Sequence, residues 1–301
     1  MLVPNQKVDL PFFKERGVTL YLKREDTIHP HISGNKYRKL KYNFVEAKQR
    51  RQDTLLTFGG AFSNHIAATA FAGQEAGLKT IGVIRGEELE EGWQKNPTLK
   101  LASEHGMKFY FISRSEYRQK GNPEYQNQLR SRFGNVYLLP EGGTNDLAIK
   151  GCEEILTEED NRFDFICSAV GTGGTIAGLI NSAQPHQKVL GFPALKGDFL
   201  NADIQKLSDS RNWELIQDYQ FGGYAKINTE LVDFINNFKK KTGIPLDPVY
   251  TGKMVFGIFD LIKKGFFKSS TQILAIHTGG LQGIKGMNEV LKRKNLPLLD
   301  L

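Results

Sequence analysis

The sequence predicts an α/β protein built from two open parallel sheets. Three observations carry this expectation: short apolar runs alternate with helical patterns, glycines bound most of these runs, and 301 residues suffice for two domains. Strand–helix alternation of this kind gives parallel sheets that are covered by helices on both faces. Ligands of such folds bind at the carboxyl ends of the strands, so we expect the active site there, between the two domains.

The predicted strands are short apolar runs that end at turn residues. They are Thr54–Phe58, Thr80–Ile84, Lys108–Ile112, Val136–Leu139, Phe163–Val170, Lys188–Phe192 and Gln272–His277. Helical patterns lie between them, and several begin at a capping residue, as where Asn96 precedes Pro97. The predicted helices are Tyr37–Lys48, Asn64–Ala76, Pro97–His105, Gln126–Phe133, Asn145–Leu156, Thr175–Ala183 and Glu230–Lys241.

The order of these elements also predicts the domains. A compact group of strand–helix units fills residues 49–150, and similar units return after the strand that begins at Phe163. We therefore expect a smaller domain, 49–150, inserted into a larger domain made of residues 1–48 and 151–301.

Composition narrows the function classes. With 40% hydrophobic and 24% charged residues, the chain is neither disordered nor fibrous. No stretch reaches the roughly 20 apolar residues of a membrane span, and Met1 to Leu10 lack the apolar core of a secretory signal. The net charge of +7 comes without a helix-turn-helix, zinc-finger or RNA-recognition signature, and the histidines and two cysteines lack metal-ligand spacing. We expect a cytoplasmic protein with no nucleic acid, membrane or metal partner.

A glycine-rich turn follows the predicted strand Phe163–Val170 and opens a helix. Backbone N–H groups converge in such a turn, and the helix N-terminus adds positive potential, so a phosphate would bind well. Ile176 stands where a dinucleotide fingerprint needs glycine, and the Gly-Lys-Ser/Thr ending of a P-loop is absent. A single phosphate ester or a plain tight turn remains. The turn consists of Gly171, Thr172, Gly173, Gly174 and Thr175.

Lys36 is the candidate nucleophile. By itself it is one of 40 Lys and Arg residues and would be a solvated charge. Ser33 or Asn35, however, can cap the following helix and place Lys36 in its first turn, where the helix dipole disfavours an ammonium ion. Burial would lower its pKa further from about 10.4, giving the neutral amine that Schiff-base chemistry requires.

Other polar residues follow strand ends. Ser63, Asn64 and His65 come after Thr54–Phe58, where they cap a helix or meet an anion such as a substrate carboxylate. Thr278 ends the last apolar strand directly before two glycines, at the edge where ligands bind.

Together these motifs resemble the family of 1-aminocyclopropane-1-carboxylate (ACC) deaminases and D-cysteine desulfhydrases. The resemblance runs in order from about residue 10 to 285, and six motifs in the correct order make it specific. It identifies a fold-type-II, tryptophan-synthase-β-like enzyme that uses pyridoxal 5'-phosphate (PLP). The motifs are Leu22–Asp26, Gly34–Leu40, Ser63–His65, Gly171–Thr175, Asp247–Tyr250 and His277–Gly280.

The resemblance implies a role for each matching residue. Lys36 is the lysine that holds PLP as a Schiff base, and Lys39 lies near the phosphate, which the Gly171–Thr175 turn binds. Asn64 bonds the 3-hydroxyl of the cofactor, while Ser63 binds the substrate carboxylate or takes part in proton transfer or ring attack. The two active-site tyrosines are Tyr224 and Tyr250.

Two positions separate the branches of the family. Thr251 and Thr278 match D-cysteine desulfhydrases, whereas ACC deaminases carry a glutamate and a leucine there. A hydroxyl beside the pyridine nitrogen suits β-elimination, so we expect D-cysteine to give pyruvate, ammonia and sulfide. The alternatives are ACC deamination, racemisation and β-replacement, because Phe62 replaces a glutamine usual in desulfhydrases. Outside PLP chemistry, a binding protein or a nucleotide-linked oxidoreductase remains open. We expect a homodimer.

Overall fold

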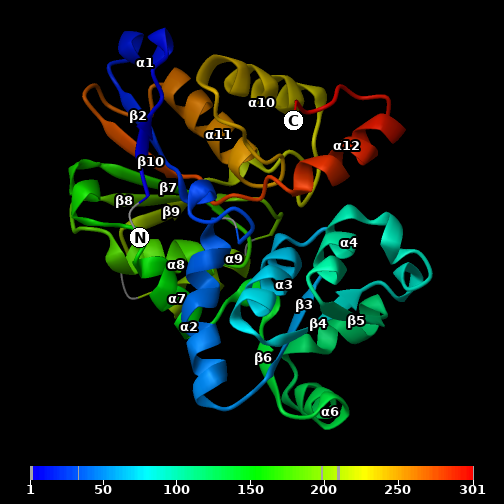
Figure 1. Ribbon diagram of the computed structural model, residues 1–301. Helices are drawn as coiled ribbons and strands as arrows, with labels where there is room; N and C mark the ends of the chain where they lie inside the picture. Colours follow the sequence, from blue (N-terminus) through cyan, green and yellow to red (C-terminus); the bar gives the residue numbers. More distant parts are fainter. Residues whose placement is uncertain (1–2, 33, 198, 209–210, 301) are drawn as a thin grey trace. The chain divides into compact units, whose positions relative to one another are not determined.

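A computed structural model describes residues 3–32, 34–197, 199–208 and 211–300. The chain forms two compact units, a larger one of residues 1–35 with 152–301 and a smaller one of residues 36–151. Each unit is an α/β structure around a parallel sheet, which confirms the predicted class (Figure 1). The units differ from the predicted domain ranges in one helix, which the contacts assign to the smaller unit. The domain ranges and the place of the active site between them stay predictions.

The larger unit is built on a sheet whose strands are parallel except for the first. Their order across the sheet is β1-β2-β10-β7-β8-β9. The bounds are β1 (Asn5–Lys7), β2 (Thr19–Lys23), β7 (Phe165–Val170), β8 (Lys188–Pro193), β9 (Trp213–Leu215) and β10 (Gln272–Ile276).

Helices cover both faces of this sheet, because its strands are apolar on both sides. In β7, Cys167 and Ala169 pack in one core with α10, α11 and α12, while Ile166 and Val170 pack in another with α8 and α9 (Figure 1). This double burial is the reason for the near-continuous apolar runs. The helices are α1 (Pro11–Glu15), α8 (Gly174–Ser182), α9 (Phe199–Leu207), α10 (Thr229–Thr242), α11 (Thr251–Lys263) and α12 (Gly283–Arg293).

The smaller unit has a fully parallel sheet in the order β5-β4-β3-β6. Its strands are β3 (Thr54–Gly59), β4 (Lys79–Arg85), β5 (Met107–Ile112) and β6 (Val136–Leu139). Helices α3 and α4 pack on one face, and α5 and α6 pack on the other. The helices are α2 (Asn35–Gln49), α3 (Asn64–Ala76), α4 (Pro97–Glu104), α5 (Arg114–Tyr117), α6 (Pro123–Phe133) and α7 (Asp146–Glu153).

All the predicted strands and helices are present, with ends that differ by up to three residues. The strand predicted from Phe163 begins at Phe165, because the 3₁₀ helix Glu158–Arg162 ends just before it. The elements that had not been predicted are β1, β2, β9, α1, α5, α9, α11 and α12. Within the described ranges, no helix has the length and apolar character needed to cross a membrane.

Candidate active site

The glycine-rich turn lies where predicted, between β7 and α8. Helix α8 begins at Gly174, and the preceding Gly173 adopts φ +82°, a conformation that glycine adopts without strain. Gly173 has no side chain to cap the helix, so the N–H groups of the first turn are available to a ligand. Thr172 is exposed on this turn and Thr175 is buried. The turn therefore fits one phosphate group.

Three of the predicted motifs meet inside the larger unit. The amide of Asn35 donates from Nδ2 to Thr175 Oγ1 at 2.7 Å, and the Asn35 backbone N–H donates to the Thr278 carbonyl at 3.4 Å. Gly34 lies so close to the same segment that a Cβ there would stand 1.9 Å from the Thr278 oxygen. The residue before Lys36 thus joins the phosphate turn and the end of β10. Ser33, the other predicted cap, lies outside the described residues.

Tyr250 and Tyr224 also lie beside this turn. A Cβ on Gly171 would stand 3.2 Å from Cε1 of Tyr250, so the tyrosine ring packs against the glycine. The Tyr224 ring meets Tyr250 edge to face, with their centroids 6.2 Å apart. Tyr224 is 42% exposed, whereas Tyr250 is half-buried. The larger unit therefore brings both predicted tyrosines to the glycine-rich turn.

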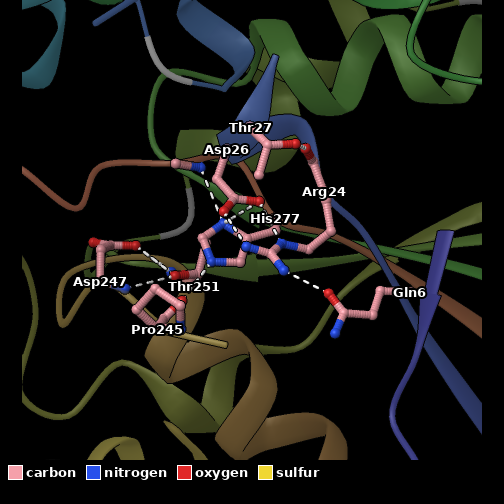
Figure 2. A network of polar contacts seen from close by, with 9 residues as sticks. Gln6, Arg24, Asp26, Thr27, Pro245, Asp247, Thr251 and His277 are labelled. Atoms are coloured by element: carbon pink, nitrogen blue, oxygen red, sulfur yellow. Dashed lines mark hydrogen bonds and ion pairs between the residues drawn. The ribbon is translucent and has the colours of Figure 1, made fainter. Parts of the chain in front are cut away.

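A buried network fixes the backbone at Thr278 (Figure 2). His277 is fully buried, its Nε2 donates to the Pro245 carbonyl at 2.7 Å, and its Nδ1 accepts the Gly279 N–H at 3.3 Å. Both ring nitrogens of His277 are thus engaged by backbone groups. Asp26, which is 3.6 Å from Nδ1, is paired instead with Arg24 through bonds of 2.8 and 2.7 Å. The hydrogen bonds of His277 and Gly279 thus hold the backbone directly before and after Thr278.

Thr251 has a different place from the one predicted. Its side chain is fully buried, and its hydroxyl donates to Asp247 Oδ1 at 2.7 Å and accepts the Asp247 N–H at 2.9 Å. Asp247 also accepts the N–H groups of Val249, Tyr250 and Thr251, so this pair starts helix α11. Because the Thr251 hydroxyl already donates and accepts, we assign it to the helix start and keep Thr278 as the hydroxyl proposed for the cofactor.

The smaller unit carries the remaining predicted residues. Ser63 caps α3, with Oγ accepting the Ile66 N–H at 3.4 Å, and Asn64 begins that helix and is half-buried. Phe62, just before them, is 48% exposed. Lys36 is half-buried in the first turn of α2. These positions agree with the prediction that Ser63 caps the helix, and they place the half-buried Ser63 after the carboxyl end of β3.

Lys39 is fixed to protein groups. Its ammonium is buried and donates to the Gly142 carbonyl at 3.1 Å and to Thr144 Oγ1 at 2.9 Å. These bonds tie α2 to the 3₁₀ helix Glu141–Gly143 and the residue after it. These bonds support a structural role for Lys39. Its role near the phosphate stays a prediction.

His65 is buried and neutral. Its Nε2 donates to Thr57 Oγ1 at 2.8 Å, because the Thr57 hydroxyl itself donates to the Leu139 carbonyl at 3.0 Å. Burial, with the positive charges of Lys36 and Lys39, holds the pKa of His65 well below its usual 6.5. Nδ1 is an acceptor without a partner in the described part of the chain. This atom is itself buried and faces Gly143, so the place of His65 beside a substrate stays a prediction.

We expect His65 to make stability depend on pH. The unfolded chain binds a proton near pH 6.5, whereas the folded chain binds it only at much lower pH, so the unfolding free energy falls as the pH drops below 6.5. The slope from this residue reaches about 1.4 kcal/mol per pH unit. The unfolding free energy, measured with urea, should fall less between pH 7.5 and pH 5.5 in a His65→Gln variant than in the wild type. His186→Gln, at an exposed histidine, should retain the wild-type slope; equal slopes in all three proteins would contradict this account.

The fold and the site indicate a class: an α/β enzyme with a glycine-rich turn at a helix N-terminus. The chain belongs to the family of pyridoxal-phosphate dependent enzymes, whose profile matches residues 3–279. It is therefore an enzyme that uses pyridoxal phosphate. The first turn of α8, which has no side-chain cap, and the Asn35–Thr175 bond fit the phosphate of this cofactor.

Individual relatives resemble the chain over most of its length. A putative 1-aminocyclopropane-1-carboxylate deaminase of Pyrococcus abyssi is 34% identical, over 90% of this chain and 87% of the relative. A mitochondrial bifunctional D-cysteine desulfhydrase/1-aminocyclopropane-1-carboxylate deaminase of Arabidopsis thaliana is 32% identical, over 89% and 74%. The crystal structure of an ACC deaminase homologue superposes with a TM-score of 0.83 at 31% identity, over 97% of this chain and 94% of that one.

Proposed function

We propose that the enzyme acts on a small amino acid, with β-elimination of D-cysteine as its main reaction. In this reaction D-cysteine and water give pyruvate, ammonia and hydrogen sulfide. The observation that carries the choice is the place of Thr278, a hydroxyl at the end of β10 whose backbone contacts Gly34 and Asn35, next to Lys36. The relatives support both this activity and ACC deamination.

When bound, PLP supplies an electron sink for the α-carbon of an amino acid. We assign its attachment to Lys36, its phosphate to the N–H groups of Gly171–Thr175, and its 3-hydroxyl to Asn64. With the cofactor bound, Lys36 Nζ would be the group that removes the α-proton, and Ser63 with Tyr250 would be the alternative base. We assign the substrate carboxylate to Ser63. Tyr224 lies beside Tyr250 as the second tyrosine.

The hydroxyl of Thr278 supports elimination over ring opening. A hydroxyl lacks the negative charge that would keep a proton on the pyridine nitrogen, so the sink is weaker than one with a carboxylate partner. Elimination from D-cysteine has an α-proton to lose and a sulfide that leaves readily. ACC has no α-proton and requires opening of a ring carbon–carbon bond, which demands more from the cofactor. Thr278 therefore favours elimination.

ACC deaminase is the second candidate because two of the relatives described above bear that name. The reaction would convert ACC and water to 2-oxobutanoate and ammonia. Racemisation or β-replacement would use the same Lys36 and the same phosphate turn, but with a different substrate pocket.

A product assay tests the proposal. We expect the purified enzyme with PLP to form pyruvate from D-cysteine and from β-chloro-D-alanine, at a kcat/KM at least tenfold above that for 2-oxobutanoate formation from ACC. A Thr278→Leu variant, with the residue typical of ACC deaminases, should lose elimination activity. Formation of 2-oxobutanoate alone would select the second candidate, and neither keto acid would reject both.

We further propose that the enzyme works in the cytoplasm as a homodimer. The proposal rests on the family resemblance and on the absence of a spanning helix in the described ranges. Light scattering on the purified holoenzyme gives the oligomeric state, and a mass of one chain would contradict it.

A further inference from the structure

The segment that carries Tyr224 has an unusual backbone. Phe221, Gly222, Gly223 and Ala225 all have positive φ, of 50°, 91°, 115° and 55°. For the two residues that are not glycine, Phe221 and Ala225, this conformation costs about 1 kcal/mol or more each. The segment contains no strand or α-helix. Such a backbone persists only where other groups hold it.

Lys253 supplies two bonds to this segment. It lies in the first turn of α11, is only 2% exposed, and its ammonium donates to the Gln220 and Gly223 carbonyls at 2.8 Å each. These carbonyls lie on either side of Phe221 and Gly222, and Gly223 directly precedes Tyr224. The same helix follows Tyr250 without a break, so Lys253 links the two tyrosine-bearing segments.

The charge of the Lys253 ammonium is buried beside a small number of polar groups. Burial lowers the pKa of Lys253 to about 8, and the negative charge of Asp247 opposes this shift. Asp247, however, directs its oxygens at the N–H groups of the helix start. The ammonium is thus compensated chiefly by two carbonyls of the strained segment. A methionine would fill the volume without the cost of burying a charge.

We propose that Lys253 is a positioning residue, which holds the Gln220–Gly223 segment so that Tyr224 stays against Tyr250. The inference rests on the proposed place of both tyrosines in the active site. Lys253 acts through the backbone that it fixes.

Hydrogen exchange of the PLP-loaded enzyme, followed by mass spectrometry, tests the link without a substrate. Loss of two charge-assisted bonds in Lys253→Met should raise exchange in peptides covering 220–226 by about tenfold or more, while peptides of β7 and β10 keep wild-type exchange. Lys253→Arg, which keeps the charge and donors, should restore much of the protection. Lys226→Met, at an exposed lysine of the same segment, is the matched control and should match the wild type.

Kinetics separate positioning from a purely structural role. We expect Lys253→Met to retain the visible absorbance of bound cofactor and to lose about tenfold or more in kcat/KM, with partial rescue by Lys253→Arg. Unchanged exchange in 220–226, or an equal rise throughout the core, would overturn the proposal. If Lys253→Met and Lys253→Gln both fail to fold, Lys253 serves the fold and the positioning role is rejected. A wild type inactive on every substrate refutes the proposed function, while the exchange result still decides the link.

Discussion

Replacement of Lys36 by alanine is expected to reduce activity by roughly a thousandfold or more, because it removes the only group assigned both to hold the cofactor covalently and to accept the α-proton. The visible absorbance of lysine-bound cofactor should disappear at the same time. The phosphate turn is unchanged in this variant, so the protein should still bind PLP reversibly. Absorbance spectra before and after gel filtration, with keto acid assays, measure both effects.

Lys48→Ala is the matched control, since Lys48 is an exposed lysine in the last turn of the same helix. Alanine is a good helix former, so this variant should keep cofactor, absorbance and activity near wild type. If Lys36→Ala retained the absorbance after gel filtration, another lysine would hold the cofactor. Lys39 would then be the first to examine, although its ammonium is engaged by Gly142 and Thr144.

The sequence predicts best the parts of the fold in which apolar runs are unbroken. Strands β3, β7 and β10 are buried on both faces, so their residues are apolar almost throughout and end at glycine or polar turns. Strand β2 was missed because it ends in Lys23, a residue that reads as exposed. In the structure Lys23 is 2% exposed and pairs with Asp160 at 2.6 Å, a partner 137 residues away. A pattern of neighbouring residues cannot predict a pair between residues so far apart in the sequence.

The same limit applies to the site. The glycine turn and Ser63 were found because they follow strands directly, where the topology of a parallel sheet brings ligands. The role of Thr251 could not be read from its position, because its bonds with Asp247 depend on how the chain turns into α11. Lys253 belongs to the same Thr-Gly-Lys run, and only its distances to Gln220 and Gly223 distinguish it from an ordinary helix lysine. The one signal in the sequence was that Lys253 lies near the start of an otherwise strongly apolar helix.

Substitution of Gly34 by alanine should have the largest effect on the fold at the site. Gly34 adopts φ +60°, and an added Cβ would stand 1.9 Å from the carbonyl oxygen of Thr278 and 2.2 Å from its carbon. The left-handed conformation costs a residue with a Cβ about 1–2 kcal/mol, and forced displacement of packed atoms costs about 1–3 kcal/mol more. We therefore expect the unfolding free energy to fall by about 2–5 kcal/mol, as measured by urea titration.

Gly77→Ala separates the contact at Gly34 from the conformational strain. Gly77 ends α3 at φ +69°, nearly the same conformation, and its Cβ would have no atom within 4 Å. This variant should therefore lose only the left-handed cost of about 1–2 kcal/mol and keep its affinity for PLP. Gly34→Ala should also weaken PLP binding, because Thr278 and Asn35 must move apart while Asn35 bonds the phosphate turn at Thr175. Equal losses of stability and unchanged PLP affinity in both variants would show that the close approach at Thr278 does not shape the cofactor site.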